Sequence, residues 1–268
     1  DLVARCLPGL TAQSLETQIQ GAMFMTEKAA GSDVGATETV ARRDGEGWRL
    51  WGDKWFCSNT DAGLALVLAR PEGAPAGIKG VSLFLLPRDL PDGRRNAYRI
   101  VRLKDKLGNK ANASSEVEYR DTWARIVGEE GRGVRTIIEM VHHTRLDTGI
   151  SAAGIMRNAV ARAVHHASHR TAFQKKLVNQ PAMRRVLADI AVESEAAAML
   201  AMRVASAFDE SASSEAEQAF ARIAVAVTKF WLCKRTPALV AEALELHGGN
   251  GYVETGEMAR LYREAPLN

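Results

Sequence analysis

The stretch EVEYRDTWARIVGEEGRGVRTIIEMV, residues 116–141, contains the change in pattern that decides the fold. It starts as a short β-like run, passes through the glycine-rich segment 128–133, and continues with apolar residues at helical spacing, among them Ile137, Ile138 and Val141. The glycines follow the order GxxGxG and not the dinucleotide-binding order GxGxxG, so we interpret 128–133 as a turn. The sequence therefore predicts a β-rich part that ends near residue 130 and a helical part after it.

Upstream of this turn, short runs rich in Val, Leu, Trp and Tyr alternate with Gly, Asp and Asn. This composition is typical of β-strands bounded by turns. The runs lie at 47–56, 64–69, 81–86, 98–103 and 116–119. Their close spacing predicts an antiparallel β-barrel or sandwich, with 71–80 as a loop. Residues 1–20 carry a partly helical pattern.

Downstream of the turn, the pattern predicts helices at 134–169, 181–208, 216–246 and 255–263. Pro181 suits the first turn of the second helix, and Pro237 predicts a kink or break inside the third. The polar run 209–214 predicts a turn, and the glycines after residue 247 end the third helix. Long antiparallel helices that follow a β part indicate an up-down helical bundle. The predicted fold class is α+β, with two domains.

Composition excludes several classes of protein. The 268 residues include 46% hydrophobic and 25% charged residues and a net charge of +3, which is globular and gives little reason to expect nucleic acid. Cys6, Cys57 and Cys233 are far apart, which argues against disulfides or a zinc site and favours a reducing cytoplasm. Histidines gather at 142–143 and 165–169 without a matching carboxylate or cysteine pattern, so we expect no metal. No apolar run approaches the length of a membrane span.

Two motifs in the β part have both a structural and a functional interpretation. The segment MTEKAAGSD at 25–33 is either a polar turn or a place where backbone N–H groups approach an anion or cofactor. The segment GDKWFCSN at 52–59 is either a half-buried strand or a ligand surface. Phe56 and Ser58 share one face of that strand, so an aromatic ring could cover a flat ligand while the hydroxyl bonds to its heteroatom.

Two more motifs lie in the helical part. Arg170 opens the segment RTAFQ at 170–174, followed by Gln180. Arginine suits a pyrophosphate because its planar fork binds oxygens in pairs, although a surface arginine at a helix break is the simpler interpretation. The segment HGGNGY at 247–252 allows a backbone to approach a ligand closely, or is only a helix cap.

The order of these motifs resembles the acyl-CoA dehydrogenase family over nearly the whole chain, from about Ala22 to Asn268. The matching segments are TEKAAGSD at 26–33, KWFCSN at 54–59, RTAF at 170–173 and GGNG at 248–251. Lys28 stands where most of the family has proline. The stretches 90–96, 102–114 and 261–268 are similar to the alkylation-response flavoproteins within that family. The resemblance implies a remnant of an N-terminal helical domain at 1–20, a middle β-barrel domain for flavin and acyl-CoA at 21–129, and a C-terminal helical bundle domain at 130–268.

The resemblance also implies an FAD site. In the β part, Thr26 and the backbone around Met25 would contact the flavin ring, and Ser32 would contact the pyrophosphate. Phe56 would pack beside the isoalloxazine, where the family has a tryptophan. Ser58 would bond near N5, where the family has a threonine.

In the helical part, the resemblance implies that Arg170 binds the pyrophosphate of a neighbouring subunit's FAD. Phe173 and Gln180 would line the adenine side, and Glu245 and Gly249 would lie along the same cofactor. Because the groups come from two subunits, the expected assembly is a homodimer or homotetramer.

The function implied is FAD-dependent α,β-dehydrogenation of an acyl-CoA thioester, in which a glutamate takes the α-proton and a hydride passes to flavin N5. In the family that glutamate usually follows the segment matching 263–268, and a variant position corresponds to Thr144, which cannot serve as a base. We therefore name no catalytic residue and expect the 268-residue stretch alone to be inactive. The alternative is a DNA-binding flavoprotein of the alkylation response with weak or no dehydrogenase activity.

Overall fold

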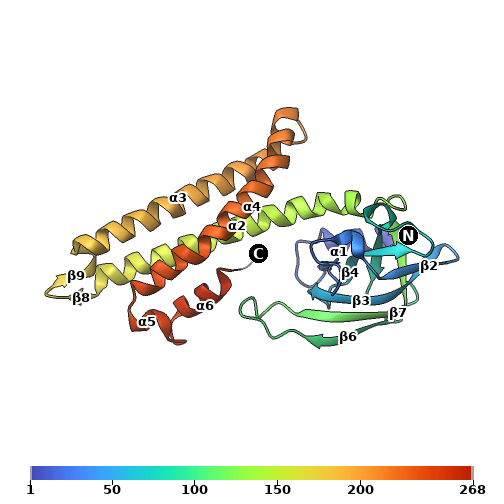
Figure 1. Ribbon diagram of the computed structural model, residues 1–268, viewed down its shortest axis with the longest axis horizontal. Helices are drawn as coiled ribbons and strands as arrows, with labels where there is room; N and C mark the ends of the chain where they lie inside the picture. Colours follow the sequence, from blue (N-terminus) through green and yellow to red (C-terminus); the bar gives the residue numbers. More distant parts are fainter. Residues whose placement is uncertain (1, 267–268) are drawn as a thin grey trace. The chain divides into compact units, whose positions relative to one another are not determined.

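Two separate units carry the two sequence patterns (Figure 1). The computed structural model describes residues 2–266, without the side chain of residue 3. The β unit comprises the residues up to Lys106 together with Lys110–Glu139, and the helical unit comprises Leu107–Asn109 and the residues from Met140 onward. The short segment at 107–109 therefore belongs with the helices, although its neighbours in sequence belong with the strands.

The strands of the β unit form one seven-stranded sheet that closes on itself. They are β1 Gly21–Phe24, β2 Val40–Asp44, β3 Gly47–Ser58, β4 Leu64–Pro71, β5 Ser82–Pro87, β6 Tyr98–Leu103 and β7 Ser114–Val127. The pairings run from β4 through β2, β3, β7 and β5 back to β4, while β1 adds to β4 and β6 adds to β7. Closure leaves few free edges, which is how β-barrels avoid aggregation through unpaired strands.

The predicted α+β class is confirmed, with two refinements in the strands. β4 pairs in parallel with both β1 and β2, whereas the other pairings of the described sheet are antiparallel. The prediction also missed β1 and β2. The second of these escapes a composition-based prediction because most of its residues are charged and exposed. Helix α1 Leu2–Leu10 and the 3-10 turns η1 Val34–Ala36 and η2 Ile78–Gly80 complete the unit.

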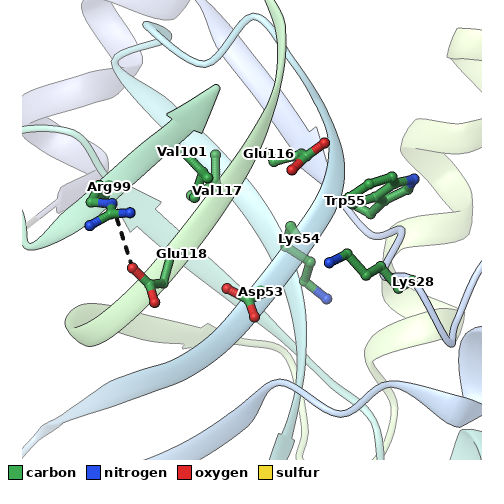
Figure 2. Close-up of a pocket in the computed structure, with 9 residues that line it drawn as sticks. All are labelled: Lys28, Asp53, Lys54, Trp55, Arg99, Val101, Glu116, Val117 and Glu118. Carbon is green, nitrogen blue, oxygen red and sulfur yellow. Dashed lines mark ion pairs between the residues drawn. The ribbon is translucent and has the colours of Figure 1, made fainter. Parts of the chain in front are cut away.

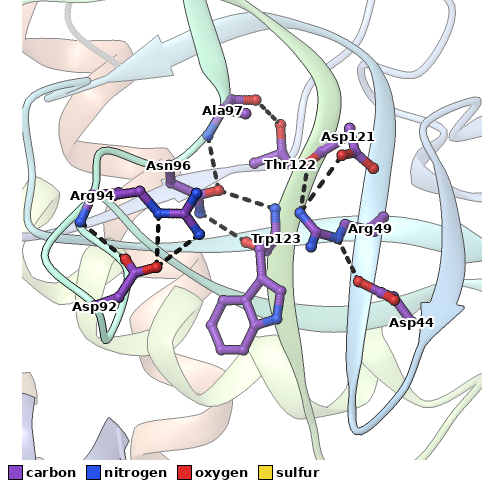
Figure 3. Close-up of polar contacts among 9 residues, drawn as sticks. All are labelled: Asp44, Arg49, Asp92, Arg94, Asn96, Ala97, Asp121, Thr122 and Trp123. Carbon is purple, nitrogen blue, oxygen red and sulfur yellow. Dashed lines mark hydrogen bonds and ion pairs between the residues drawn. The ribbon is translucent and has the colours of Figure 1, made fainter.

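The interior of the barrel is filled by side chains that alternate inward along the strands. The buried residues of this core include Phe24, Leu50, Val67, Phe84 and Tyr119. The buried side-chain amide of Asn96 is one of the groups that hold the segment between β5 and β6 against the barrel (Figure 3). Its Nδ2 donates to the backbone oxygens of Pro87 and Trp123, both at 2.8 Å, and its Oδ1 accepts from the Trp123 amide at 3.0 Å.

The helical unit is built from three long helices and two short ones. They are α2 Gly133–His169, which starts in the β unit, α3 Pro181–Glu210, α4 Glu215–Glu245, α5 Gly249–Tyr252 and α6 Glu257–Glu264. A two-stranded hairpin, β8 Thr171–Ala172 with β9 Lys175–Lys176, and the turn η3 Leu177–Asn179 connect α2 to α3. The core contains many alanines, such as Ala159, Ala163, Ala197 and Ala201. Small side chains allow helix axes to approach closely.

The helix boundaries differ from the predicted ones at the end of α3 and at Pro237. α3 continues through 209–210, so the turn before α4 is shorter than predicted, and Ser214 caps α4 through the Glu217 amide at 3.3 Å. α4 also continues through Pro237 without a break. After α4, Gly248 has a φ of 60°, a left-handed conformation that does not continue the helix, as predicted. The short helix α5, which was not predicted, begins at Gly249. None of the described helices combines the length and apolarity that a membrane crossing requires.

Candidate functional site

In the β unit, the chain segment after β1 lies along the last residues of β3. The Trp55 amide donates to the Thr26 carbonyl at 2.8 Å, and the Asn59 side chain donates to the Gln20 side chain at 2.9 Å. These two links are at opposite ends of the segment that contains Phe56 and Ser58. The structure therefore brings Met25, Thr26, Phe56 and Ser58 into one neighbourhood, although about thirty positions separate them in the sequence.

A buried ion pair holds this junction together. Lys54 Nζ lies 2.6 Å from Glu27 Oε1, and the two side chains are 0% and 4% exposed. Lys54 also donates to the Met25 carbonyl at 3.2 Å. The Glu27 carboxylate accepts further from the Glu38 amide at 2.6 Å, and from the Thr39 amide at 3.2 Å and the Thr39 hydroxyl at 2.6 Å. We call this set of Glu27, Lys54 and Thr39 the clamp.

The electrostatics of the clamp follow from its contacts. Burial alone would raise the pKa of Glu27, but the charge of Lys54 and the hydrogen bonds from Lys54, Thr39 and Glu38 outweigh it, so the pKa is lowered. The carboxylate is thus held ionised beside its cation. A buried pair of this kind is costly to break from one side, because the remaining charge stays buried without a partner. The clamp therefore fixes the position of Met25 and Thr26 relative to β3.

The hydroxyls predicted to bind the cofactor have no partner inside the protein. Within the described residues, the side-chain hydroxyls of Thr26, Ser32 and Ser58 make no hydrogen bond. Thr26 and Ser58 are half-buried, Ser32 is exposed, and Phe56 is 45% exposed. Hydroxyls at the surface that bond only to water can exchange that water for a ligand, so these three are available to one. Burial raises the pKa of the neighbouring Cys57 thiol to about 12, which keeps it protonated.

The end of β3 departs from simple alternation. The register of β3 against β7 shifts between Lys54 and Cys57, which places a bulge next to Phe56. Lys54 and Cys57 are both buried, and the two aromatic residues between them are more exposed. The ammonium group of Lys104 lies 3.6 Å from the centroid of the Trp55 ring and 5.0 Å from that of Phe56. The bulge thus presents both aromatic rings near one cation.

A small cavity of about 210 Å³ is lined in part by Lys54 of the clamp (Figure 2). Its lining is mostly charged and includes Lys28, Asp53, Trp55, Arg99 and Glu118. The Lys28 ammonium lies 4.8 Å from the Trp55 ring, and Arg99 pairs with Glu118 at 3.7 Å. The cationic and anionic groups of the lining balance one another, so this cavity has no strong preference for a charged ligand.

In the helical unit, the β8–β9 hairpin groups three of the predicted residues. Gln180 donates through Nε2 to the Ala172 carbonyl at 3.2 Å, and the Leu177 amide donates to the Arg170 carbonyl at 2.9 Å. Phe173 and Gln174 form the tip with φ values of 51° and 63°. A bulky aromatic residue in this left-handed conformation is strained, and strain of this kind is characteristic of functional sites. The Phe173 side chain is 92% exposed.

Arg170 and the end of α4 meet at a second cavity of about 810 Å³. Arg170 and His247 both line it, and the rings of His166 and His247 lie 4.7 Å apart. Glu245 and Gly249 flank His247 in the chain and are exposed, but they do not line the cavity. Of the segment 245–250, His247 and Asn250 contribute to the lining, and the predicted role of Glu245 and Gly249 stays a prediction.

Two groups of residues were not predicted from the sequence. The first is Glu27 and Lys54, which lie within the quoted motifs but had no role assigned. Lys54 was the available signal, because a lysine inside a strand with many apolar residues needs a partner for its charge. The second group is the histidines of α2, which were weighed only as metal ligands. The described residues contain no group with the arrangement of a metal site. The remaining carboxylate of interest, Glu264, accepts from the Asn109 amide at 2.7 Å within the helical unit.

Comparison with known proteins defines the class. Residues 22–122 match the family described as "Acyl-CoA dehydrogenase, middle domain", and residues 131–268 match "Acyl-CoA dehydrogenase, C-terminal domain". The two matches cover most of the chain and correspond to the β and helical parts. The chain belongs to the acyl-CoA dehydrogenase family.

Among individual proteins, the chain is similar to the putative acyl-CoA dehydrogenase AidB of Escherichia coli, with 45% identity over 92% of this chain and 44% of that protein. It superimposes with a TM-score of 0.95 on Caenorhabditis elegans ACDH-11 in complex with C11-CoA, at 32% identity over 99% of this chain and 46% of that one. A Bacillus anthracis acyl-CoA dehydrogenase complexed with FAD has the same fold, with a TM-score of 0.81 at 24% identity over 92% of this chain and 44% of that one. The chain thus spans less than half the length of these relatives.

Proposed function

We propose that this chain is the cofactor-binding part of an FAD-dependent acyl-CoA dehydrogenase. The observation that carries the proposal is the group of unpartnered hydroxyls around an exposed aromatic ring at the β1–β3 junction. Thr26 and Ser58 are half-buried and make no hydrogen bond among the described residues, and Phe56 is 45% exposed between the links that hold this junction. A flat ring with polar edges, such as an isoalloxazine, fits this set of groups.

The helical unit supports the same proposal. The Arg170 guanidinium makes no hydrogen bond or ion pair within the described residues, so its donors are available to a pyrophosphate. Phe173 is held in a strained conformation with almost all of its surface exposed, which suits a residue that becomes covered by a ligand or a second copy of the chain. Gln180 and the segment around Gly249 would lie, with Arg170, along the FAD of a neighbouring subunit.

FAD and the residues of the chain have separate roles in the proposed reaction. FAD, when bound, supplies the hydride acceptor for oxidation of the Cα–Cβ bond of an acyl-CoA thioester. The chain's own residues bind and orient: Thr26 and Ser58 donate hydrogen bonds to polar edges, Phe56 packs against a face, and the clamp keeps Met25 and Thr26 in register with β3. We assign no residue as the base for the α-proton. Thr144 uses its hydroxyl to donate to the Met140 carbonyl at 3.1 Å.

The experiment that tests this proposal is FAD binding by the purified protein and by Arg170→Ala. A charge-assisted hydrogen bond contributes about 1.5–3 kcal/mol, so the substitution should weaken FAD binding by about 10- to 150-fold. Arg157→Ala is the matched control. Arg157 lies on α2, is exposed as Arg170 is, and likewise has no side-chain partner among the described residues. Fluorescence titration of FAD measures the affinity.

The catalytic part of the proposal has its own test. An acyl-CoA of suitable chain length should bleach the flavin absorbance of the protein loaded with FAD. If the protein binds no FAD, or if Arg170→Ala binds it as tightly as Arg157→Ala, the proposed site is wrong. If FAD binds but no acyl-CoA of a chain-length series bleaches it, the cofactor site stands and the dehydrogenase activity is rejected.

A further inference from the structure

The cavity at the end of α2 has an unusual lining, which we call the histidine pocket. Its volume is about 810 Å³, and all of its residues belong to the helical unit. α2 contributes His165, His166 and His169, the end of α4 contributes His247, and two arginines stand among them. The lining residues with ionisable side chains are Arg162, His165, His166, His169, Arg170, His247 and Glu257.

Hydrogen bonds determine which nitrogen of two of these rings carries the proton. His169 Nδ1 lies 2.7 Å from the His165 carbonyl, and His247 Nδ1 lies 2.7 Å from the Ala243 carbonyl. A carbonyl oxygen only accepts, so both Nδ1 atoms carry the proton. The Nε2 atoms are left without a partner among the described residues. Each is an acceptor while its ring is neutral and becomes a donor when the ring is protonated.

The positive charge of the pocket has little compensation. Glu257 is the one acidic residue among the described lining residues, and it already pairs with Arg162, which also donates to Asn158 at 2.9 Å. Arg170 has no such partner. Lys176 adds a further cation nearby, because its ammonium donates to the His169 carbonyl at 2.7 Å. Each histidine that takes up a proton therefore adds charge that only a bound anion can neutralise.

The histidines are also close enough to affect one another. The rings of His165 and His169 lie 4.3 Å apart, and those of His166 and His247 lie 4.7 Å apart. Burial lowers the pKa of His166, and the charges of His247, Arg170 and His165 lower it further. The pKa of His166 is therefore lower than that of an ordinary histidine. An anion placed between the rings would reverse that effect, because it attracts the protons that the cations repel.

We propose that the histidine pocket is a protonation-dependent site for a phosphate-class dianion, and that its histidines strengthen anion binding as the pH falls. The inference rests on the proposed function in one respect: Arg170, which we assign to the pyrophosphate of FAD, forms one wall of the pocket. The diphosphate of FAD and a free inorganic anion offer the same chemistry to these donors. The acid-dependent affinity is a property of the four histidines and does not require an acyl-CoA.

Linkage gives the expected size of the effect. If binding is accompanied by uptake of one proton, the dissociation constant falls by up to about tenfold for each unit by which the pH is lowered. This holds between the histidine pKa value of the bound protein and that of the free protein. Below both pKa values the affinity becomes constant, because the histidines are then charged in either state. A site that contains only arginine would show no such pH dependence, because the charge of arginine does not change in this range.

The test is the binding of sulfate and of FAD to the purified protein by calorimetry, from about pH 8 to about pH 5.5. Sulfate and the diphosphate diester of FAD keep a constant charge over this range, so any pH dependence belongs to the protein. We expect both ligands to bind at least about tenfold more tightly at the acid end. The double variant His166→Gln with His247→Gln should lose most of this gain and bind at the acid end as it does near neutral pH.

His143→Gln is the matched control, because His143 is an exposed histidine of α2 that does not line the pocket. It should keep the wild-type pH profile. A flat pH profile for sulfate, or an unchanged profile in the double variant, would overturn the inference. Failure of the proposed function looks different: FAD would not bind at any pH, while sulfate would still bind with acid-dependent affinity that the double variant loses. Circular dichroism confirms that the variants remain folded.

Discussion

At the scale of single residues, Thr39 and Tyr119 show the contrast between a buried hydroxyl of the β unit that has a strong partner and one that has none. Thr39 is fully buried and its hydroxyl donates to Glu27 at 2.6 Å, whereas Tyr119 is 1% exposed and its hydroxyl has no partner in the described chain. A buried polar group stabilises a protein only when it is paired, and removing an unpaired one relieves a desolvation cost. The two residues are thus expected to respond oppositely to loss of the hydroxyl.

We predict that Thr39→Val lowers the free energy of unfolding by about 1–3 kcal/mol, because it leaves the Glu27 carboxylate with one donor fewer. Tyr119→Phe should leave that free energy unchanged within about 0.5 kcal/mol or raise it slightly. Urea denaturation monitored by tryptophan fluorescence measures both. A loss of stability in Tyr119→Phe as large as that in Thr39→Val would mean that the tyrosine hydroxyl has a partner in solution.

At the scale of elements, two glycines have opposite roles in the helical unit. Gly154 lies on the exposed side of α2, and a Cβ there would meet nothing within 4 Å. At Gly108 a Cβ would lie 2.3 Å from the carbonyl oxygen of Arg263, so the close approach of the 107–109 segment to α6 depends on glycine. The same segment is held by the bond from the Asn109 amide to Glu264.

Gly154→Ala should raise the free energy of unfolding by about 0.5–1 kcal/mol, because alanine loses less backbone entropy in a helix. Gly108→Ala should lower it by about 1 kcal/mol or more, because backbone atoms cannot move aside as a flexible side chain can. Thermal unfolding followed by circular dichroism compares the two variants directly. Equal melting temperatures for both would contradict the packing seen at Gly108.

At the scale of the whole molecule, acid stability should depend on the clamp. The pKa of Glu27 is lowered in the folded protein from an ordinary value of 4.5, so the unfolded chain binds the proton more readily. The stabilisation from Glu27 is therefore fully present above about pH 4.5 and is lost as the pH falls through the lowered folded pKa. Near neutral pH the clamp contributes its full amount.

The corresponding measurement is the melting temperature as a function of pH for Glu27→Gln. This variant should be less stable than wild type near pH 7 and should lose less stability on acidification. Glu72→Gln is the control, because the Glu72–Arg42 pair at 3.0 Å is exposed on both sides and contributes little. If the acid-induced loss of stability is the same in Glu27→Gln and in wild type, the clamp is not the source of the acid sensitivity.

Much of the architecture could be read from local patterns. The helices α2, α3 and α4 are long and periodic, so their positions were predicted to within a few residues. The turn at 128–133 was predicted from its glycines, and Gly128 and Gly131 indeed have φ values of 73° and 76°. The strand β1 was missed because it is short and pairs with β4, which is distant in sequence. The strand β2 was missed because most of its residues are charged and exposed, although it forms a hairpin with β3. Local composition contains no information about such pairings.

The sequence by itself determined the class of fold, the point where strands give way to helices, and the segments that carry the candidate cofactor groups, because these depend on periodicity and on motifs within short windows. Only the tertiary structure decided that Glu27 and Lys54 form a buried pair, that a bulge lies beside Phe56, and that His247 joins the histidines of α2 around one pocket. The physical reason is distance along the chain: burial, charge pairing and strand register are set by residues that meet only after folding.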